Sequence, residues 1–112
     1  MSNELRKIAN IQDEREIYTL DRRIMKISEE AGELAEAYLS VTSLNNTKDK
    51  NWMDVMEEAV DVAIVAMDIA LYRPEFARDE DFSVHFAKVE NMFEKKLQKW
   101  KQKLENDETV MY

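Results

Sequence analysis

The sequence has no cysteine, and only one glycine and one proline among its 112 residues. The absence of cysteine excludes disulfides and thiolate chemistry, so a reducing cytoplasm is the expected location. Sheet proteins need turn residues at frequent intervals, and the shortage of glycine and proline therefore favours a few long helices. A chain of this length is expected to form one domain over residues 1–112, with a frayed tail over 106–112.

The sequence also lacks a long apolar run and an excess of basic residues. Its most apolar segment, 62–71, is interrupted by Asp68 and is too short to cross a bilayer. The first residues mix both charge signs and do not resemble a signal peptide. The formal net charge of −8 disfavours sequence-independent binding to nucleic acid, which needs a cationic surface. Metal ions can still bridge an acidic protein to a small anionic ligand.

Hydrophobic periodicity predicts four helices. The first is expected over 3–16, and the second from about Asp21, a candidate N-cap, to a polar loop over 44–47. The third is expected from about Asp49 to about residue 72, ahead of the only proline. The fourth is expected to start at Asp81 or Ser83, with one stripe of large apolar residues that predicts a packing seam: Phe82, Phe86, Val89, Phe93, Leu97, Trp100 and Leu104.

The second half of the third predicted helix is apolar nearly all the way round. A helix without a polar face is expected to be buried on every side. Four helices of this length can hardly enclose one of their number completely. A second subunit is therefore expected to cover part of it.

Two segments carry paired carboxylates with the same spacing. Glu30 and Glu33 lie three residues apart in the second predicted helix, and Glu58 and Asp61 lie three apart in the third. Such residues share one helix face, so antiparallel packing would bring all four carboxylates together. A partly buried cluster of this kind stays ionised only when a cation neutralises it, and all-oxygen ligation suits Mg²⁺, Mn²⁺ or Ca²⁺. Solvated acids on a charged helix are the alternative for either segment alone.

Three further residues bear on this choice. Asp61 opens the apolar run, which predicts a buried position where an unpaired carboxylate is costly. Gly32 lies mid-helix between two proposed ligands, at a cost of about 1 kcal/mol relative to alanine, and predicts close approach by a helix or a ligand. His85, the only histidine, does not follow a glutamate by three residues, so the Glu-x-x-His pairs of di-iron bundles are not expected. These features favour a hard-metal site.

The segment KISEEAGELAEA, followed after a loop by DVMEEAVDVAIVAMDIA, resembles the MazG-like family of all-α nucleoside triphosphate pyrophosphohydrolases. The family pattern is Glu-Glu-x-x-Glu, a spacer of variable length, and then Glu-x-x-Asp, and both halves are present in this order. The resemblance extends over about residues 21–71. It implies an all-α bundle of four, or at most five, helices per subunit, completed by dimerisation as a homodimer or a dimer of dimers.

The resemblance also implies Mg²⁺-dependent attack of water on a nucleoside triphosphate, giving the monophosphate and pyrophosphate, with Mn²⁺ as a possible substitute. Bound metal would neutralise and orient the triphosphate and activate the water. Glu29 and Glu57 match the doubled acids of the motif and would orient the water or a second metal, although solvated acids are the open alternative. The matching positions make metal ligands of the four paired carboxylates: Glu30, Glu33, Glu58 and Asp61.

Candidates for binding the nucleotide lie on the second and fourth predicted helices. Lys26 shares a helix face with Glu30 and can either contact a phosphate oxygen or pair with that carboxylate. Members of the family often place asparagine and basic residues of the fourth helix towards the triphosphate. The residues of this kind here are Lys88, Asn91, Lys95 and Lys96.

Three more residues have two interpretations each. Tyr38 and Trp52 can stack on a base, although core packing is the expectation for both. Asp68 is expected to pair with a lysine of the fourth helix or with a ribose hydroxyl.

The leading hypothesis is an enzyme of nucleotide-pool control or house-cleaning that acts on a (deoxy)nucleoside triphosphate, without nucleic acid or a membrane as partner. The related phosphoribosyl-ATP pyrophosphohydrolase of histidine biosynthesis is a second enzymatic interpretation. A helical interaction module without activity is a third, and Mg²⁺ would not change the melting temperature of such a module.

Overall fold

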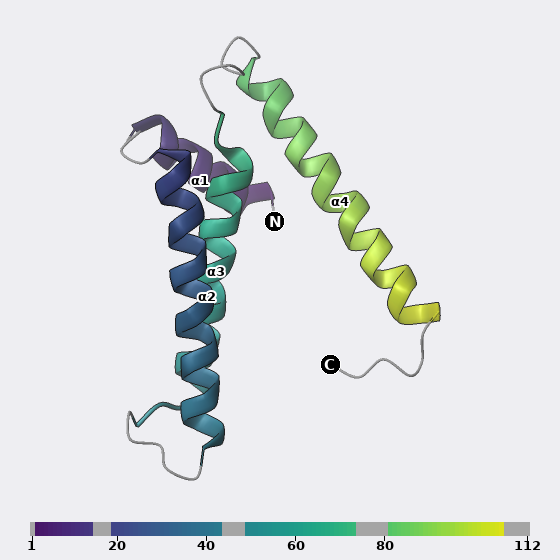
Figure 1. The fold of residues 1–112 in the computed structure, drawn as a ribbon. Coiled ribbons are helices and arrows are strands. Elements are labelled where there is room, and N and C mark those ends of the chain that lie inside the picture. The colour runs from purple at the N-terminus through teal and green to yellow at the C-terminus, as the bar shows by residue number, and fades with distance from the viewer. Residues whose placement is uncertain (1, 15–18, 44–48, 74–80, 107–112) are drawn as a thin grey trace. The chain divides into compact units, whose positions relative to one another are not determined.

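The computed structural model describes residues 2–14, 19–43, 49–73 and 81–106, which are helical apart from a few residues at the helix ends (Figure 1). These ranges contain four helices and no strand, which confirms the all-α prediction: α1 (Ser2–Glu14), α2 (Leu20–Thr42), α3 (Trp52–Leu71) and α4 (Phe82–Asn106). The chain divides into two compact units, Met1–Pro74 with α1 to α3 and Glu75–Tyr112 with α4. The single-domain interpretation stays a prediction.

The start of α2 differs from the prediction. Thr19, not Asp21, is the N-cap, and its hydroxyl accepts from the backbone N–H of Arg22 at 3.5 Å. Asp21 lies in the first turn, where a carboxylate interacts favourably with the partial positive charge of the helix N-terminus. The helix ends at Thr42, and the predicted loop over 44–47 lies outside the described residues.

The start of α3 is set by a capping box. Asn51 Oδ1 accepts from the backbone N–H of Asp54 at 3.2 Å, and Asp54 Oδ2 accepts from the backbone N–H of Asn51 at 2.8 Å. These bonds satisfy backbone donors that the first helical turn leaves free. The predicted start at Asp49 is wrong, because Asp49 has a φ of 51° and cannot continue a right-handed helix.

The other helix ends agree with expectation within the described residues. Helix α4 begins at Phe82, directly after Asp81, whose Oδ1 accepts from the backbone N–H of Ser83 at 2.9 Å. Helix α1 begins one residue earlier than predicted, and residue 16, its predicted end, lies outside the described residues. The predicted frayed tail lies outside them beyond residue 106.

Helices α2 and α3 run side by side in opposite directions, and α1 packs against α3 (Figure 1). The core of the first unit contains Leu5 and Ala9 of α1, Ala37 of α2 and Leu71 of α3, each at most 2 % exposed. Burying a leucine side chain of this kind stabilises the fold by about 2 kcal/mol. The antiparallel α2–α3 pair is the part of the fold that positions the paired carboxylates.

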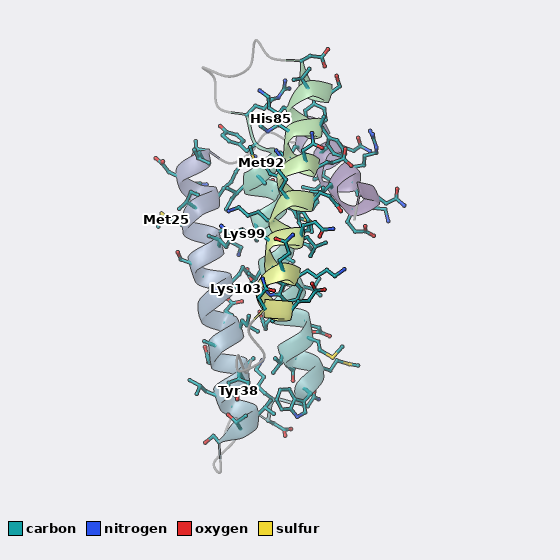
Figure 2. The ribbon with its side chains drawn as sticks, turned by 90° about the vertical axis from the view of Figure 1, so that its right-hand side faces the viewer. Met25, Tyr38, His85, Met92, Lys99 and Lys103 are labelled. Carbon is teal, nitrogen blue, oxygen red and sulfur yellow. The ribbon has the colours of Figure 1, made fainter. Side chains whose placement is uncertain are left out.

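Several predicted core positions are exposed. Along α3, Met53, Met56, Val60 and Ile64 form an exposed apolar stripe, so the chain alone does not enclose this helix, and its cover by a second subunit stays a prediction. Core packing is wrong for Tyr38 and Trp52, which are exposed and contact each other with ring centroids 6.1 Å apart. The side chains of Met25 and Tyr38 stand out from α2 (Figure 2).

The apolar stripe of α4 is divided along its length. Phe86 and Val89 are buried, whereas Phe93, Leu97 and Trp100 are exposed. Helix α4 belongs to a compact unit of its own, so the packing seam predicted for it stays a prediction. Among the described residues, no helix is both long and apolar enough to cross a membrane.

Candidate metal centre

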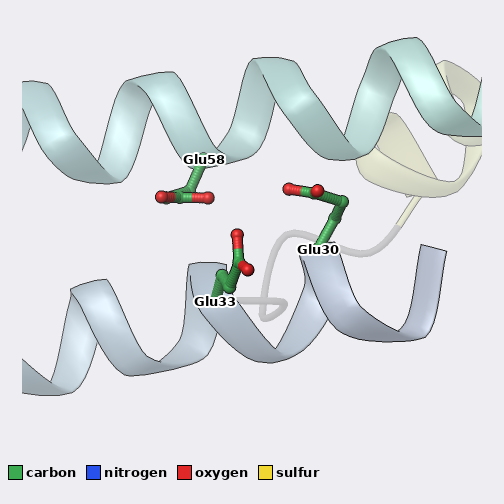
Figure 3. A group of neighbouring side chains, drawn as sticks. All are labelled: Glu30, Glu33 and Glu58. Atoms are coloured by element: carbon green, nitrogen blue, oxygen red, sulfur yellow. The ribbon is translucent and has the colours of Figure 1, made fainter. Parts of the chain in front are cut away.

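Three of the four paired carboxylates converge between α2 and α3. Glu30 and Glu33 point from α2 towards α3, and Glu58 points from α3 towards α2 (Figure 3). One carboxylate oxygen of each residue lies within 4.8 Å of one from each of the others. Two oxygens that bind the same Mg²⁺ at about 2.1 Å lie about 3 to 4 Å apart. Small side-chain rotations therefore suffice for these carboxylates to share an ion.

Burial makes this cluster different from solvated acids on a helix surface. Glu30 is only 7 % exposed, Glu58 is half-buried and Glu33 lies at the exposed rim. Glu30 Oε2 and Glu58 Oε2 are buried and have no hydrogen-bond partner. Leaving a charged acceptor buried and unpaired is costly, and a bound cation removes that cost. The orphaned oxygens thus fit a hard divalent ion, and the all-oxygen donor set suits Mg²⁺, Mn²⁺ or Ca²⁺.

The electrostatics of Glu58 point the same way. Burial raises the pKa of this carboxyl above its usual value, and the negative charges of Glu33, Asp61 and Glu30 raise it further. A neutralising charge close to the Glu58 carboxylate would therefore stabilise its ionised form. A divalent cation would supply it and hold the group ionised.

Lys26 is the cation that contacts the cluster. Its Nζ lies 3.1 Å from Glu30 Oε1 and 3.7 Å from Glu29 Oε2. The hydrogen bond to Glu30 and the charge of that carboxylate raise the pKa of Lys26. Lys26 was expected to contact either a phosphate oxygen or Glu30, and the structure contains the pair with Glu30. The other oxygen of this carboxylate, Glu30 Oε2, has no partner.

Asp61 and Gly32 differ from the expectations for them. Asp61 is exposed in the chain and is not part of the three-residue cluster, although its charge still acts on Glu58. The prediction that Asp61 is buried, which was based on the apolar residues that follow it, is therefore wrong. A Cβ on Gly32 would meet none of the described atoms within 4 Å, so no neighbouring helix requires this glycine.

The remaining sequence candidates are exposed. Glu29 and Glu57 are both exposed, and Glu29 contacts Lys26, so neither is built into the cluster. The α4 candidates Asn91, Lys95 and Lys96 are exposed along the helix, and Lys88 precedes them by one turn. Their roles in binding a triphosphate stay predictions.

A second polar group, which the sequence interpretation missed, ties the three helices of this unit together. Arg23 of α2 is 5 % exposed and forms an ion pair with Asp68 of α3. Gln12 of α1 donates to Asp68 O and Asp68 Oδ1, both at 2.7 Å. The Arg23 guanidinium also lies over the Tyr72 ring, 4.6 Å from its centroid. Asp68 is thus bonded to Arg23 and Gln12, and its expected pairing with a fourth-helix lysine or a ribose hydroxyl stays a prediction.

The sequence does contain a signal for Arg23. Arg23, Glu30 and Ala37 are separated by seven residues each, and these are the buried residues of α2. Residues seven apart share one face of a helix. Arg23 thus shares the buried face of α2 with Glu30, and its partner Asp68 comes from α3.

A groove of about 750 Å³ lies beside the cluster, between α1, α2 and α3. Its polar lining includes Arg22, Lys26 and Asp68. Its volume is within the range of about 300–1,000 Å³ that is usual for small-molecule sites. Lys26 belongs both to this groove and to the Glu30 ion pair, so the groove reaches the edge of the acidic cluster. The apolar part of the lining is formed by Ile8, Ile11, Met25, Ile64 and Val65.

No protein-family model, curated protein or solved structure matches this chain. The resemblance of its acidic motif to a family therefore stays a prediction, and the geometry of the cluster is the evidence for its chemistry.

Proposed function

We propose that this chain is a MazG-like pyrophosphohydrolase that converts a (deoxy)nucleoside triphosphate and water into the monophosphate and pyrophosphate. The observation that carries the proposal is the buried Glu30 carboxylate, whose Oε2 has no partner and which lies beside Glu33 on α2 and near Glu58 of the antiparallel helix α3. A helical protein without a cation to bind has no need of this arrangement, because it leaves buried oxygens unpaired.

The protein supplies ligands and orientation. Glu30, Glu33 and Glu58 would hold Mg²⁺, with Asp61 joining from the adjacent turn of α3. When bound at these residues, Mg²⁺ would neutralise phosphate charge and supply an activated water for the hydrolysis. Glu30 and Glu58 are held between α2 and α3, so their positions are fixed before a substrate arrives, which favours catalysis by orientation.

The groove beside the cluster supports a substrate with an apolar ring and an anionic tail. Ile8 and Ile11 can pack against the face of a base, while Arg22 and Lys26 add positive charge to the lining. The groove thus combines the two kinds of contact that a nucleotide needs. The basic residues of α4 are the further candidates for the triphosphate.

We also propose that two copies pair in the cytoplasm, as a homodimer or a dimer of dimers. The exposed apolar stripe of α3 supports this, because Met53, Met56, Val60 and Ile64 follow one another on a single helix face. A chain that stays monomeric at micromolar concentration would contradict the pairing.

The test is a panel of ribo- and deoxyribonucleoside triphosphates, with phosphoribosyl-ATP included, assayed with Mg²⁺ for pyrophosphate. We expect pyrophosphate and the monophosphate as primary products, and no turnover by Glu33→Gln, which removes one charged ligand but keeps the size of the side chain. Glu105→Gln on α4 is the matched control and should keep full activity, since Glu105 is exposed and pairs with Lys101, which does not belong to the cluster. Orthophosphate as the primary product, or an active Glu33→Gln variant, would contradict the proposal.

A further inference from the structure

Lys26 occupies an unusual place for a surface lysine. Its side chain is 55 % exposed, yet its Nζ lies 3.1 Å from an oxygen of the Glu30 side chain, which is 9 % exposed. A charge at the solvent edge thus neutralises a charge in the interior. The other oxygen of the same carboxylate has no partner, so the lysine satisfies only half of it.

This pair would conflict with a metal ion at the cluster. An ammonium and a divalent cation on the same carboxylate are much closer than the Debye length of about 8 Å, so salt would not screen their repulsion. Glu30 cannot leave, because it is held between the helices, whereas Lys26 is attached by a flexible four-carbon chain that reaches solvent. Of the two partners, Lys26 is the one able to move.

The structure also provides a place for the displaced ammonium. Lys26 lines the groove together with Arg22, where an anion would find two positive charges. Glu29 Oε2, at 3.7 Å from Nζ, lies at the exposed edge and gives the ammonium a second acceptor outside the interior. The movement needs only rotation about the side-chain bonds of Lys26.

We infer that Lys26 is an exchangeable counter-ion. It neutralises Glu30 in the metal-free protein, yields that carboxylate to the metal, and then binds an oxygen of the substrate's phosphate chain. The inference rests on the proposed function, since it needs metal at the cluster. Lys26 would thus bind Glu30 in the metal-free site and a phosphate oxygen in the metal-loaded site.

Removal of the Lys26 ammonium should change the affinities for metal and for the phosphate chain in opposite directions. Without the ammonium, the metal has no competitor for Glu30, so metal should bind more tightly. Without the ammonium, the phosphate chain loses a charged donor, so it should bind more weakly. A lysine that only stabilises α2 would change neither affinity, and one that only binds phosphate would leave metal affinity unchanged.

The experiment compares the wild-type chain with Lys26→Met and with Lys101→Met at fixed ionic strength. Lys101 is the matched control because it forms an exposed i,i+4 pair with Glu105 that involves no residue of the cluster. Calorimetry first measures binding of Mn²⁺ alone. It then measures binding of inorganic tripolyphosphate to each protein in the presence of Mn²⁺, which avoids any dependence on the base.

For Lys26→Met we expect Mn²⁺ to bind about two- to fivefold more tightly, as loss of an exposed ion pair predicts. We expect tripolyphosphate to bind about tenfold more weakly, and Lys101→Met to match the wild type. Lys26→Arg, which keeps the positive charge, should restore both affinities towards wild-type values. These opposite changes are the signature of exchange.

Two kinds of failure can be told apart. If the wild type binds no Mn²⁺, the metal centre itself is wrong, and the inference fails with it. If the wild type binds Mn²⁺ but Lys26→Met leaves that affinity unchanged or weakens it, the metal centre stands and the exchange is wrong.

Discussion

Replacing Arg23 by methionine should destabilise the fold more than any other single change of a charged residue in α2. Arg23 is 5 % exposed, pairs with Asp68 and lies over the Tyr72 ring. Methionine keeps the apolar stem but leaves the Asp68 carboxylate without its cation. Removing one partner of a fully buried ion pair costs about 3–5 kcal/mol.

The expected cost here is smaller, because Asp68 is 27 % exposed and water can reach it, and because Gln12 still donates to its Oδ1. We therefore expect a loss of about 2–3 kcal/mol in the free energy of unfolding. Such a loss is a large part of the total stability of about 5–15 kcal/mol that is usual for a small protein. It would move the midpoint of urea unfolding by about 1–2 M.

The assay is urea unfolding followed by circular dichroism, at one protein concentration for all variants. Arg22→Met is the matched control, since the neighbouring Arg22 is exposed, and its change should stay within about 0.5 kcal/mol. The double variant Arg23→Met with Asp68→Asn should lose less than the sum of the single changes, because no unpaired charge remains. An Arg23→Met variant within about 0.5 kcal/mol of the wild type would refute the reasoning.

Two further predictions concern the cluster. The raised pKa of Glu58 means that the folded chain binds a proton here more readily than the unfolded chain. This contribution to the stability of the metal-free protein is present below the unfolded pKa of 4.5 and is lost as pH rises through the raised folded value. Thermal melts of the wild type should therefore gain stability on acidification relative to Glu58→Gln, and an equal pH dependence of both would contradict it. Gly32→Ala should stabilise the metal-free fold by about 1 kcal/mol, because a Cβ there meets no described atom within 4 Å, and a destabilised variant would show that something does approach this position.

The local spacing of charged residues was enough to predict three of the clustered carboxylates: Glu30, Glu33 and Glu58. Glu30 and Glu33 are three residues apart, and one helix turn suffices to place both on the face that meets α3. Glu58 then joins them through antiparallel packing, which follows from two long helices joined by a short connection. These are properties of the sequence within a few residues of each carboxylate.

The contacts that the sequence did not predict depend on distant residues. Arg23 and Asp68 are 45 positions apart, and nothing near either residue identifies the other as its partner. Asp61 was expected to be buried because apolar residues follow it, but a helix turns by about 100° per residue and the next position can face another way. Tyr38 and Trp52 were expected in the core for their size, yet they contact each other at the surface.

The start of α3 could likewise be predicted only in part from the sequence. The sequence located α3 to within three residues, but the choice between Asp49 and Asn51 as the start depended on backbone geometry. Asn51 forms a capping box with Asp54, while Asp49 adopts a positive φ. Both are residue types that favour helix N-termini, so composition alone does not separate them.

The most direct test of the account is calorimetric titration of the metal-free chain and of Glu58→Gln with Mg²⁺. Glu58→Gln keeps the shape of the side chain but removes the charge that α3 contributes to the cluster of described carboxylates. The account predicts saturable Mg²⁺ binding by the wild type and its loss in the variant, with both proteins equally helical. Equal Mg²⁺ binding by the two proteins, or none by the wild type, would contradict the assignment of these carboxylates as a metal centre.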